Sequence, residues 1–123
     1  MAKILIVDDE PEYLEHLSRI LSRQGYEVET AESAEQAIEI SQRFAPDVLI
    51  ADWMLRGQLN GLDVARTLDS DNPALVAIVT TGYPVSRLRG RLAESGNVLV
   101  LEKPFGADEL LAMVRKAMRM AKE

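Results

Sequence analysis

Residues 48–61 have the sequence VLIADWMLRGQLNG, which carries the main clue to the fold. Four apolar residues run directly into Asp52, after which the chain becomes irregular and contains glycine. A short apolar run bounded by turn residues predicts a strand that is buried on both faces, as in parallel sheets. A carboxylate at the tip of such a strand loses solvation, so its presence there calls for a chemical explanation.

Similar apolar runs recur along the chain and alternate with helical patterns. Strands are predicted at residues 3–8, 26–30, 47–52, 74–81 and 97–102, and helices at 11–25, 33–44, 62–69, 85–95 and 106–123. Alternation of this kind, with right-handed crossovers, predicts an α/β fold. We expect a doubly wound parallel sheet of five strands with helices on both faces.

Two of the helices have features that can be checked. The helix at 33–44 is expected to begin at the N-cap residue Ser33, with Gln36 placed as in a capping box. Its predicted inner face consists of Ala34, Ala37, Ile38 and Ser41. The helix at 85–95 contains Gly90, which costs about 1 kcal/mol relative to Ala and predicts a weak, mobile element.

Length and composition limit the function classes. The 123 residues fit one domain, spanning 1–123, and Cys is absent. No apolar stretch reaches signal-peptide or membrane-spanning length, which predicts a cytoplasmic protein. The net charge of −6 argues against unspecific nucleic-acid binding. Residues 1–52 carry 12 acidic and 4 basic residues, whereas residues 53–123 carry 8 acidic and 10 basic residues, so the acidity lies in the first half.

Polar or charged residues that could form a site stand at the ends of the predicted strands 3–8, 47–52, 74–81 and 97–102, namely Asp8, Asp9, Asp52, Thr80, Thr81, Glu102 and Lys103. Ligands of open α/β sheets bind beyond the carboxyl ends of the strands, so we expect these side chains to converge. Three carboxylates in one crevice repel one another unless a cation is bound, and oxygen ligands suit Mg²⁺. Lys103 suits a phosphate oxygen, and Asp52 is placed to attack phosphorus and form an acyl phosphate.

Four segments together resemble the receiver domain of two-component response regulators: ILIVDDEP (4–11), DVLIADWML with NGLD (47–55 and 60–63), AIVTTG (77–82) and LEKPF (101–105). The resemblance covers essentially the whole chain. It implies a flavodoxin-like sheet with strand order 2-1-3-4-5. It also implies a phosphorylation-dependent signalling switch that acts on a partner or effector, rather than a metabolic enzyme.

The resemblance assigns roles to individual residues. It implies that Asp52 accepts a phosphoryl group from a histidine kinase or a histidine phosphotransfer protein. It implies that Asp8, Asp9, Asp52 and the main-chain carbonyl of Met54 surround Mg²⁺, and that Thr81 and Lys103 contact the phosphoryl group. A cis peptide bond before Pro104 is also implied. The surface formed by the fourth helix, the fifth strand and the last helix is then the candidate for an effector contact or a homodimer.

The sequence departs from the family pattern at three points. Arg56 stands where receivers often have Pro, and the loop at 53–61 is one residue longer than the commonest form. Val100 occupies the position, three residues before the lysine, where an aromatic residue often reports phosphorylation. The chemistry is therefore better supported than the usual aromatic switch.

Other interpretations of these residues remain open. Asp8 and Asp9 are also typical of a helix N-terminus, where Glu10 and Glu12 would serve the first turn. Thr81 could simply satisfy a backbone group, and His16 is expected to be a surface residue. A phosphatase with an aspartyl nucleophile would need a second acid at the position of Met54, which argues against that class. A degenerate receiver that acts as a phosphate-independent interaction platform is the main alternative.

Overall fold

The computed structural model describes residues 2–55, 57, 59–82, 84 and 97–121. Five strands lie within these residues: β1 (Lys3–Val7), β2 (Glu27–Ala31), β3 (Val48–Asp52), β4 (Val76–Thr81) and β5 (Val98–Glu102). All neighbouring strands pair in parallel, and their order is β2-β1-β3-β4-β5. The predicted sheet and its strand order are confirmed, with strand bounds that move by one or two residues.

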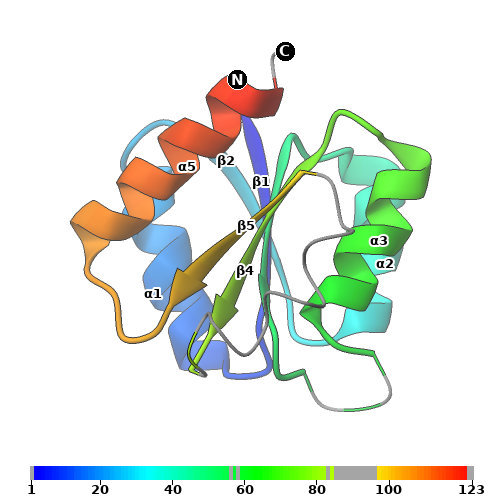
Figure 1. Cartoon of the computed structure of the whole chain (residues 1–123), viewed down its shortest axis with the longest axis horizontal. Coiled ribbons are helices and arrows are strands. Elements are labelled where there is room, and N and C mark those ends of the chain that lie inside the picture. The colour runs from blue at the N-terminus through cyan, green and yellow to red at the C-terminus, as the bar shows by residue number, and fades with distance from the viewer. Residues whose placement is uncertain (1, 56, 58, 83, 85–96, 122–123) are drawn as a thin grey trace.

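Four helices flank the sheet within the described residues: α1 (Pro11–Ser22), α2 (Ala34–Phe44), α3 (Gly61–Asp71) and α5 (Ala107–Ala121). Figure 1 shows α1 and α5 on one face of the sheet and α2 and α3 on the other. None of these helices is long and apolar enough to cross a bilayer. The helix predicted at 85–95, with Gly90, lies outside the described residues.

Each face of the sheet has its own hydrophobic core. Alternate residues of a strand point to opposite faces, so Ile4 and Ile6 join the core under α1 and α5. Leu5 and Val7 join the core under α2 and α3. Because both faces are covered, the central strands are apolar at consecutive positions, as expected for a parallel sheet.

The N-terminus of α2 confirms only part of the predicted capping box. The side chain of Ser33 accepts a hydrogen bond from the backbone N–H of Gln36 at 3.1 Å, as predicted. The side chain of Gln36 accepts from the backbone N–H of Glu32 at 2.8 Å, one residue before the expected donor. The cap is therefore extended by one residue, and both backbone donors are satisfied.

The predicted inner face of α2 was only partly right. The residues that are buried are Ala34, Ala37, Ile40 and Phe44, whereas Ile38 and Ser41 are half-buried. The buried set is spaced by three or four residues along the whole of α2, which packs against both the sheet and α3. This shared packing selects Ile40 and Phe44, and the sequence pattern by itself did not indicate it.

The strand order brings together the strand ends on which the site depends. The chain moves outward from β1 to β2, returns to β3, and then proceeds to β4 and β5 on the other side. The direction of winding thus changes between β1 and β3, which is where ligands bind in sheets of this type. The carboxyl ends of these strands lie at the bottom of Figure 1.

Candidate functional site

Two carboxylates lie at the carboxyl ends of neighbouring central strands. Asp8 directly follows β1, and Asp52 is the last residue of β3. Asp8 is 2% exposed and Asp52 is 8% exposed, so both are removed from bulk water. Among the described residues, the buried polar or charged positions are these two acids and the two threonines that end β4. The buried polar chemistry of the described structure is therefore gathered at one end of the sheet.

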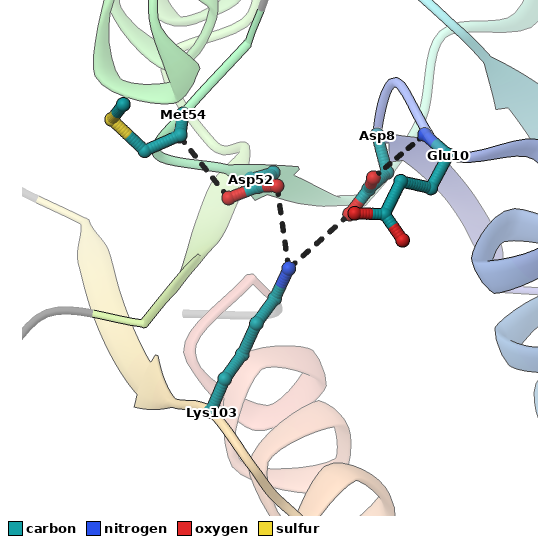
Figure 2. Close-up of polar contacts among 5 residues, drawn as sticks. All are labelled: Asp8, Glu10, Asp52, Met54 and Lys103. Atoms are coloured by element: carbon teal, nitrogen blue, oxygen red, sulfur yellow. Dashed lines mark hydrogen bonds and ion pairs between the residues drawn. The ribbon is translucent and has the colours of Figure 1, made fainter.

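The two acids are held by matching turns. The Oδ1 atom of Asp8 accepts a hydrogen bond from the backbone N–H of Glu10 at 3.0 Å. The Oδ1 atom of Asp52 accepts from the backbone N–H of Met54 at 3.1 Å. Each carboxylate thus bonds to the backbone two residues ahead, as Asp does in Asx-turns. Figure 2 shows that both acids use one oxygen for this turn and direct the other toward Lys103.

Lys103 bridges the two acids. Its Nζ atom lies 3.3 Å from Oδ2 of Asp52 and 3.5 Å from Oδ2 of Asp8. The backbone N–H of Lys103 donates to the carbonyl of Thr81 at 2.6 Å, which fixes the residue just beyond β5. The Lys103–Pro104 peptide bond is cis, as the sequence predicted. An ammonium group therefore lies over both carboxylates and remains partly exposed to solvent.

The two threonines of β4 occupy different places in the register. Thr80 pairs with Asp52 across β3 and β4, whereas Thr81 pairs with Glu102 across β4 and β5. Both are fully buried, and the carbonyl of Thr80 accepts from the backbone N–H of Trp53 at 2.8 Å. Thr81 is thus the last residue of β4 and lies beside the end of the strand that carries Lys103.

Helix α3 begins in close contact with the backbone of Asp52. The N–H of Gly61 donates to the carbonyl of Trp53 at 3.3 Å. A Cβ atom at Gly61 would lie 2.8 Å from the carbonyl carbon of Asp52 and nearer still to its oxygen. The reciprocal capping box of Asn60 and Asp63, with hydrogen bonds of 2.8 and 2.9 Å, fixes this start of the helix. Only glycine fits where the loop returns to Asp52.

The acids at the end of β1 suit a hard divalent cation. Oxygen atoms of Asp8, Asp9 and Glu10 lie within 4.8 Å of one another. Burial raises the pKa of Asp8 to about 6, and the negative charge of Asp52 adds to the rise. The Glu10 hydrogen bond and the charge of Lys103 act in the opposite direction. These ligand atoms are all oxygens, they are partly buried, and their negative charges repel one another. Such a set of donors fits Mg²⁺.

Two residues near the site were not identified from the sequence. Glu10 was assigned to the first turn of a helix, but it precedes α1 and its side chain makes no cap hydrogen bond. Its carboxylate instead belongs to the acidic group with Asp8 and Asp9. Tyr13, on α1, places its ring 4.6 Å from Nζ of Lys103. Both residues lie beyond the end of β1, whereas the predicted site consisted of residues at the strand ends.

The residues around the site differ in their exposure to solvent. Trp53 is 6% exposed and packs with Leu62 and Val79, so its ring is buried beside the site. The side chain of Met54 is 55% exposed and points away from the carboxylate of Asp52 in Figure 2. Val100 is half-buried within β5, and His16 is exposed on α1. Arg56 and residues 85–96 lie outside the described residues.

The sequence of this chain is similar to those of known proteins. The family model for the response regulator receiver domain matches residues 4–115. The chain is 38% identical over 120 residues to Response regulator MprA of Mycobacterium leprae, covering 98% of this chain and 52% of that protein. It is 34% identical over 116 residues to the Probable transcriptional regulatory protein TcrX of Mycobacterium tuberculosis, covering 94% of this chain and 49% of that protein. The chain spans about half the length of these curated relatives.

Solved structures show the same architecture. The receiver domain of NtrX from Brucella abortus superimposes with a TM-score of 0.85 at 30% identity, covering 94% of this chain and 98% of that one. A CheY-like response regulator receiver domain protein from Methanospirillum hungatei gives a TM-score of 0.90 at 24% identity, covering 99% and 97%. The second likeness supports the fold alone.

Proposed function

The chain belongs to the response regulator receiver domain family, and we propose that it is a signalling switch phosphorylated on Asp52. The observation that carries this proposal is the pair of carboxylates, Asp8 and Asp52, at the ends of neighbouring strands, with the ammonium of Lys103 close to both. We propose that residues 1–123 act as one receiver domain. In this proposal the phosphoryl donor is a phosphohistidine of a histidine kinase or a phosphotransfer protein.

In the proposed reaction, a carboxylate oxygen of Asp52 attacks the phosphorus of the donor. The P–O bond forms as the P–N bond to the donor imidazole breaks, and the leaving ring takes up one proton from water, so that it departs as neutral imidazole. The Asx-turn with Met54 fixes the plane of the Asp52 carboxylate, so little reorientation is needed before attack. The product is an acyl phosphate at the tip of β3.

The remaining residues stabilise charge in this proposal. Asp8, Asp9 and Asp52, with the main-chain carbonyl of Met54, would hold Mg²⁺, and Glu10 is close enough to assist. Mg²⁺ bound there would neutralise negative charge that develops on the phosphoryl oxygens. The ammonium of Lys103 would pair with one phosphoryl oxygen, and the hydroxyl of Thr81 would donate to another.

We propose the effect of phosphorylation on the rest of the domain by analogy with other receiver domains. Phosphorylation would shift an equilibrium between two conformations, with the change centred on the segment after Thr81. The surface that would contact an effector or a second copy of the chain consists of β5, α5 and residues 85–96. The domain assists its own phosphorylation and dephosphorylation and carries out no metabolic reaction in this proposal.

The proposal can be tested with a small phosphodonor. The protein is incubated with acetyl phosphate and Mg²⁺, and phosphoryl addition is followed by intact mass and by peptide mapping. We expect one phosphoryl group on Asp52, and none on the Asp52→Ala variant. Asp69→Ala, which removes an exposed acid from α3, is the matched control and should be labelled like the parent.

Two results would argue against the proposal. Persistent labelling of Asp52→Ala would assign the phosphoacceptor elsewhere. A parent that takes up no phosphoryl group and binds no Mg²⁺ by calorimetry would favour the phosphate-independent interaction platform.

A further inference from the structure

The ammonium of Lys103 has a third neighbour that the proposed reaction does not use. Its Nζ atom lies 4.6 Å from the centroid of the Tyr13 ring, within the range of a cation–π contact. The other two neighbours are Oδ2 of Asp8 and Oδ2 of Asp52. Tyr13 lies in the first turn of α1, whereas Lys103 follows β5, so the contact joins two segments far apart in sequence.

The Tyr13 ring is itself held in place. It is half-buried and packs against the hydrophobic core beneath α1 and α5. The ring of Phe105, two residues after Lys103, meets it edge to face with centroids 6.3 Å apart and planes at 68°. Burial, followed by the charges of Asp8, Asp52 and Glu10, raises the pKa of the Tyr13 phenol. The ring is therefore a fixed and neutral surface beside a flexible lysine.

The contacts of Lys103 with the two carboxylates and with the Tyr13 ring differ in whether a bound cation would compete for them. A cation bound by Asp8 and Asp52 draws on the same carboxylate oxygens that now face the ammonium. The Tyr13 ring offers no such ligand, so a bound cation would not compete for its contact with Lys103. A lysine has four rotatable bonds and loses much conformational freedom when held, so a contact that is not competed for matters for its placement.

We propose that Tyr13 is a positioning residue for Lys103. Its ring keeps the ammonium over the ends of β1 and β3 while the carboxylates bind a cation, so that Lys103 can meet a phosphoryl oxygen. The use of this role in phosphorylation rests on the proposed function. The placement of Lys103 by the ring can nevertheless be measured without any phosphoryl group. The competing interpretation is that Tyr13 only fills the edge of the core.

Two exchanges at Tyr13 separate these interpretations. Tyr13→Phe keeps the ring and removes only the hydroxyl, whereas Tyr13→Leu keeps an apolar side chain and removes the ring. Tyr26→Leu is the matched control, because Tyr26 packs against the same core near the start of β2, away from Lys103. A purely structural role would make the two Leu variants behave alike.

The first measurement is the proton chemical shift of the lysine ε-methylene groups by NMR. The sequence has only four lysines, and Lys103→Arg assigns the resonance of interest. An upfield ring-current shift of Lys103 is expected in the parent, in Tyr13→Phe and in Tyr26→Leu, and its loss is expected in Tyr13→Leu. Lys3, which lies 5.7 Å from the ring of Phe44, is the internal reference and should not change.

The second measurement is the affinity for beryllofluoride, a mimic of aspartyl phosphate, in saturating Mg²⁺. Tyr13→Leu should weaken it about 3- to 30-fold, the range that a cation–π contact supplies, and Tyr13→Phe should change it less than about twofold. Equal affinity in all variants would overturn the positioning role and leave the proposed function standing. Absence of the ring-current shift in the parent would overturn it even if Tyr13→Leu does not fold.

The two proposals can fail separately. If the parent binds no beryllofluoride but the ring-current pattern is as expected, the placement of Lys103 by Tyr13 is supported and the phosphorylation function is refuted. If Tyr13→Leu and Tyr26→Leu lose the same stability and the same affinity, Tyr13 only fills the core.

Discussion

Replacing Gly61 with Ala tests the contact between the start of α3 and the backbone of Asp52. The added Cβ would lie 2.8 Å from the carbonyl carbon of Asp52 and 3.2 Å from the carbonyl oxygen of Ala51. Both neighbours are backbone atoms, so neither can rotate away as a side chain would. Relief requires that α3 move away from β3 by several tenths of an ångström, against the buried contacts of Leu62 and the Asn60 cap.

The expected loss of stability can be worked from opposing effects. Overpacking costs about 1 to 3 kcal/mol, and Ala regains up to about 1 kcal/mol of helix propensity over Gly. From the middle of the overpacking range, about 2 kcal/mol, a net loss of about 1 to 2 kcal/mol remains, which should lower the melting temperature by about 4 to 8 °C in a domain of this size. Urea and thermal unfolding, followed by the fluorescence of the buried Trp53, measure this loss.

Gly106→Ala is the control for this experiment. A Cβ at Gly106 meets only the flexible carboxylate of Glu109, at 4.0 Å, so its cost should stay well below that of Gly61→Ala. If Gly61→Ala is as stable as the parent or more so, helix propensity outweighs the contact. A larger residue would then fit beside Asp52, and glycine would not be required at position 61.

Two further predictions concern the charges of the site. Lys103→Ala should retain Mg²⁺ binding but weaken beryllofluoride binding about 10-fold or more, because a charged hydrogen bond is lost; an unchanged affinity by fluorescence titration would refute its role. The pKa of Asp8 is about 6 in the folded protein and 3.8 for the ordinary group, so in EDTA the folded state binds more protons between these values. The contribution of Asp8 to stability should therefore rise as pH falls from about 7 to about 4, and saturating Mg²⁺ should reverse the trend. Thermal melts of the parent and of Asp8→Asn at several pH values measure this contribution, which the variant should lack. Identical pH profiles of the melting temperature in the two proteins would contradict the raised pKa of Asp8.

The fold could be predicted from the sequence because its signals are local. Five apolar runs, separated by helical patterns, leave few alternatives to a parallel sheet covered on both faces. The inner face of α2 could not be predicted as well, because Ile38 and Ile40 are both apolar. Packing of α2 against the sheet and α3 together selects Ile40, and that arrangement is a property of the whole fold.

The site could be predicted as far as the strand ends define it. Asp52 ends β3, Asp8 and Lys103 directly follow β1 and β5, and the sheet brings the three residues together. Tyr13 and Glu10 were missed because the turn after β1 determines where they lie. Pro11 at the start of α1 was the available signal, since it places Tyr13 in the first helical turn and hence beside the strand ends.

The position of Lys103 between two carboxylates would make the proposed cation binding at this site an ion exchange. A divalent cation that reaches Asp8 and Asp52 must displace an ammonium group that already neutralises part of their charge. The ammonium of Lys103 thus competes with the cation for the same oxygens. The apparent affinity for the cation is the intrinsic affinity multiplied by the fraction of time that Lys103 leaves these oxygens free. In the proposed function, such competition would keep the cation exchangeable, so that the occupancy of the site would follow the surrounding Mg²⁺ concentration.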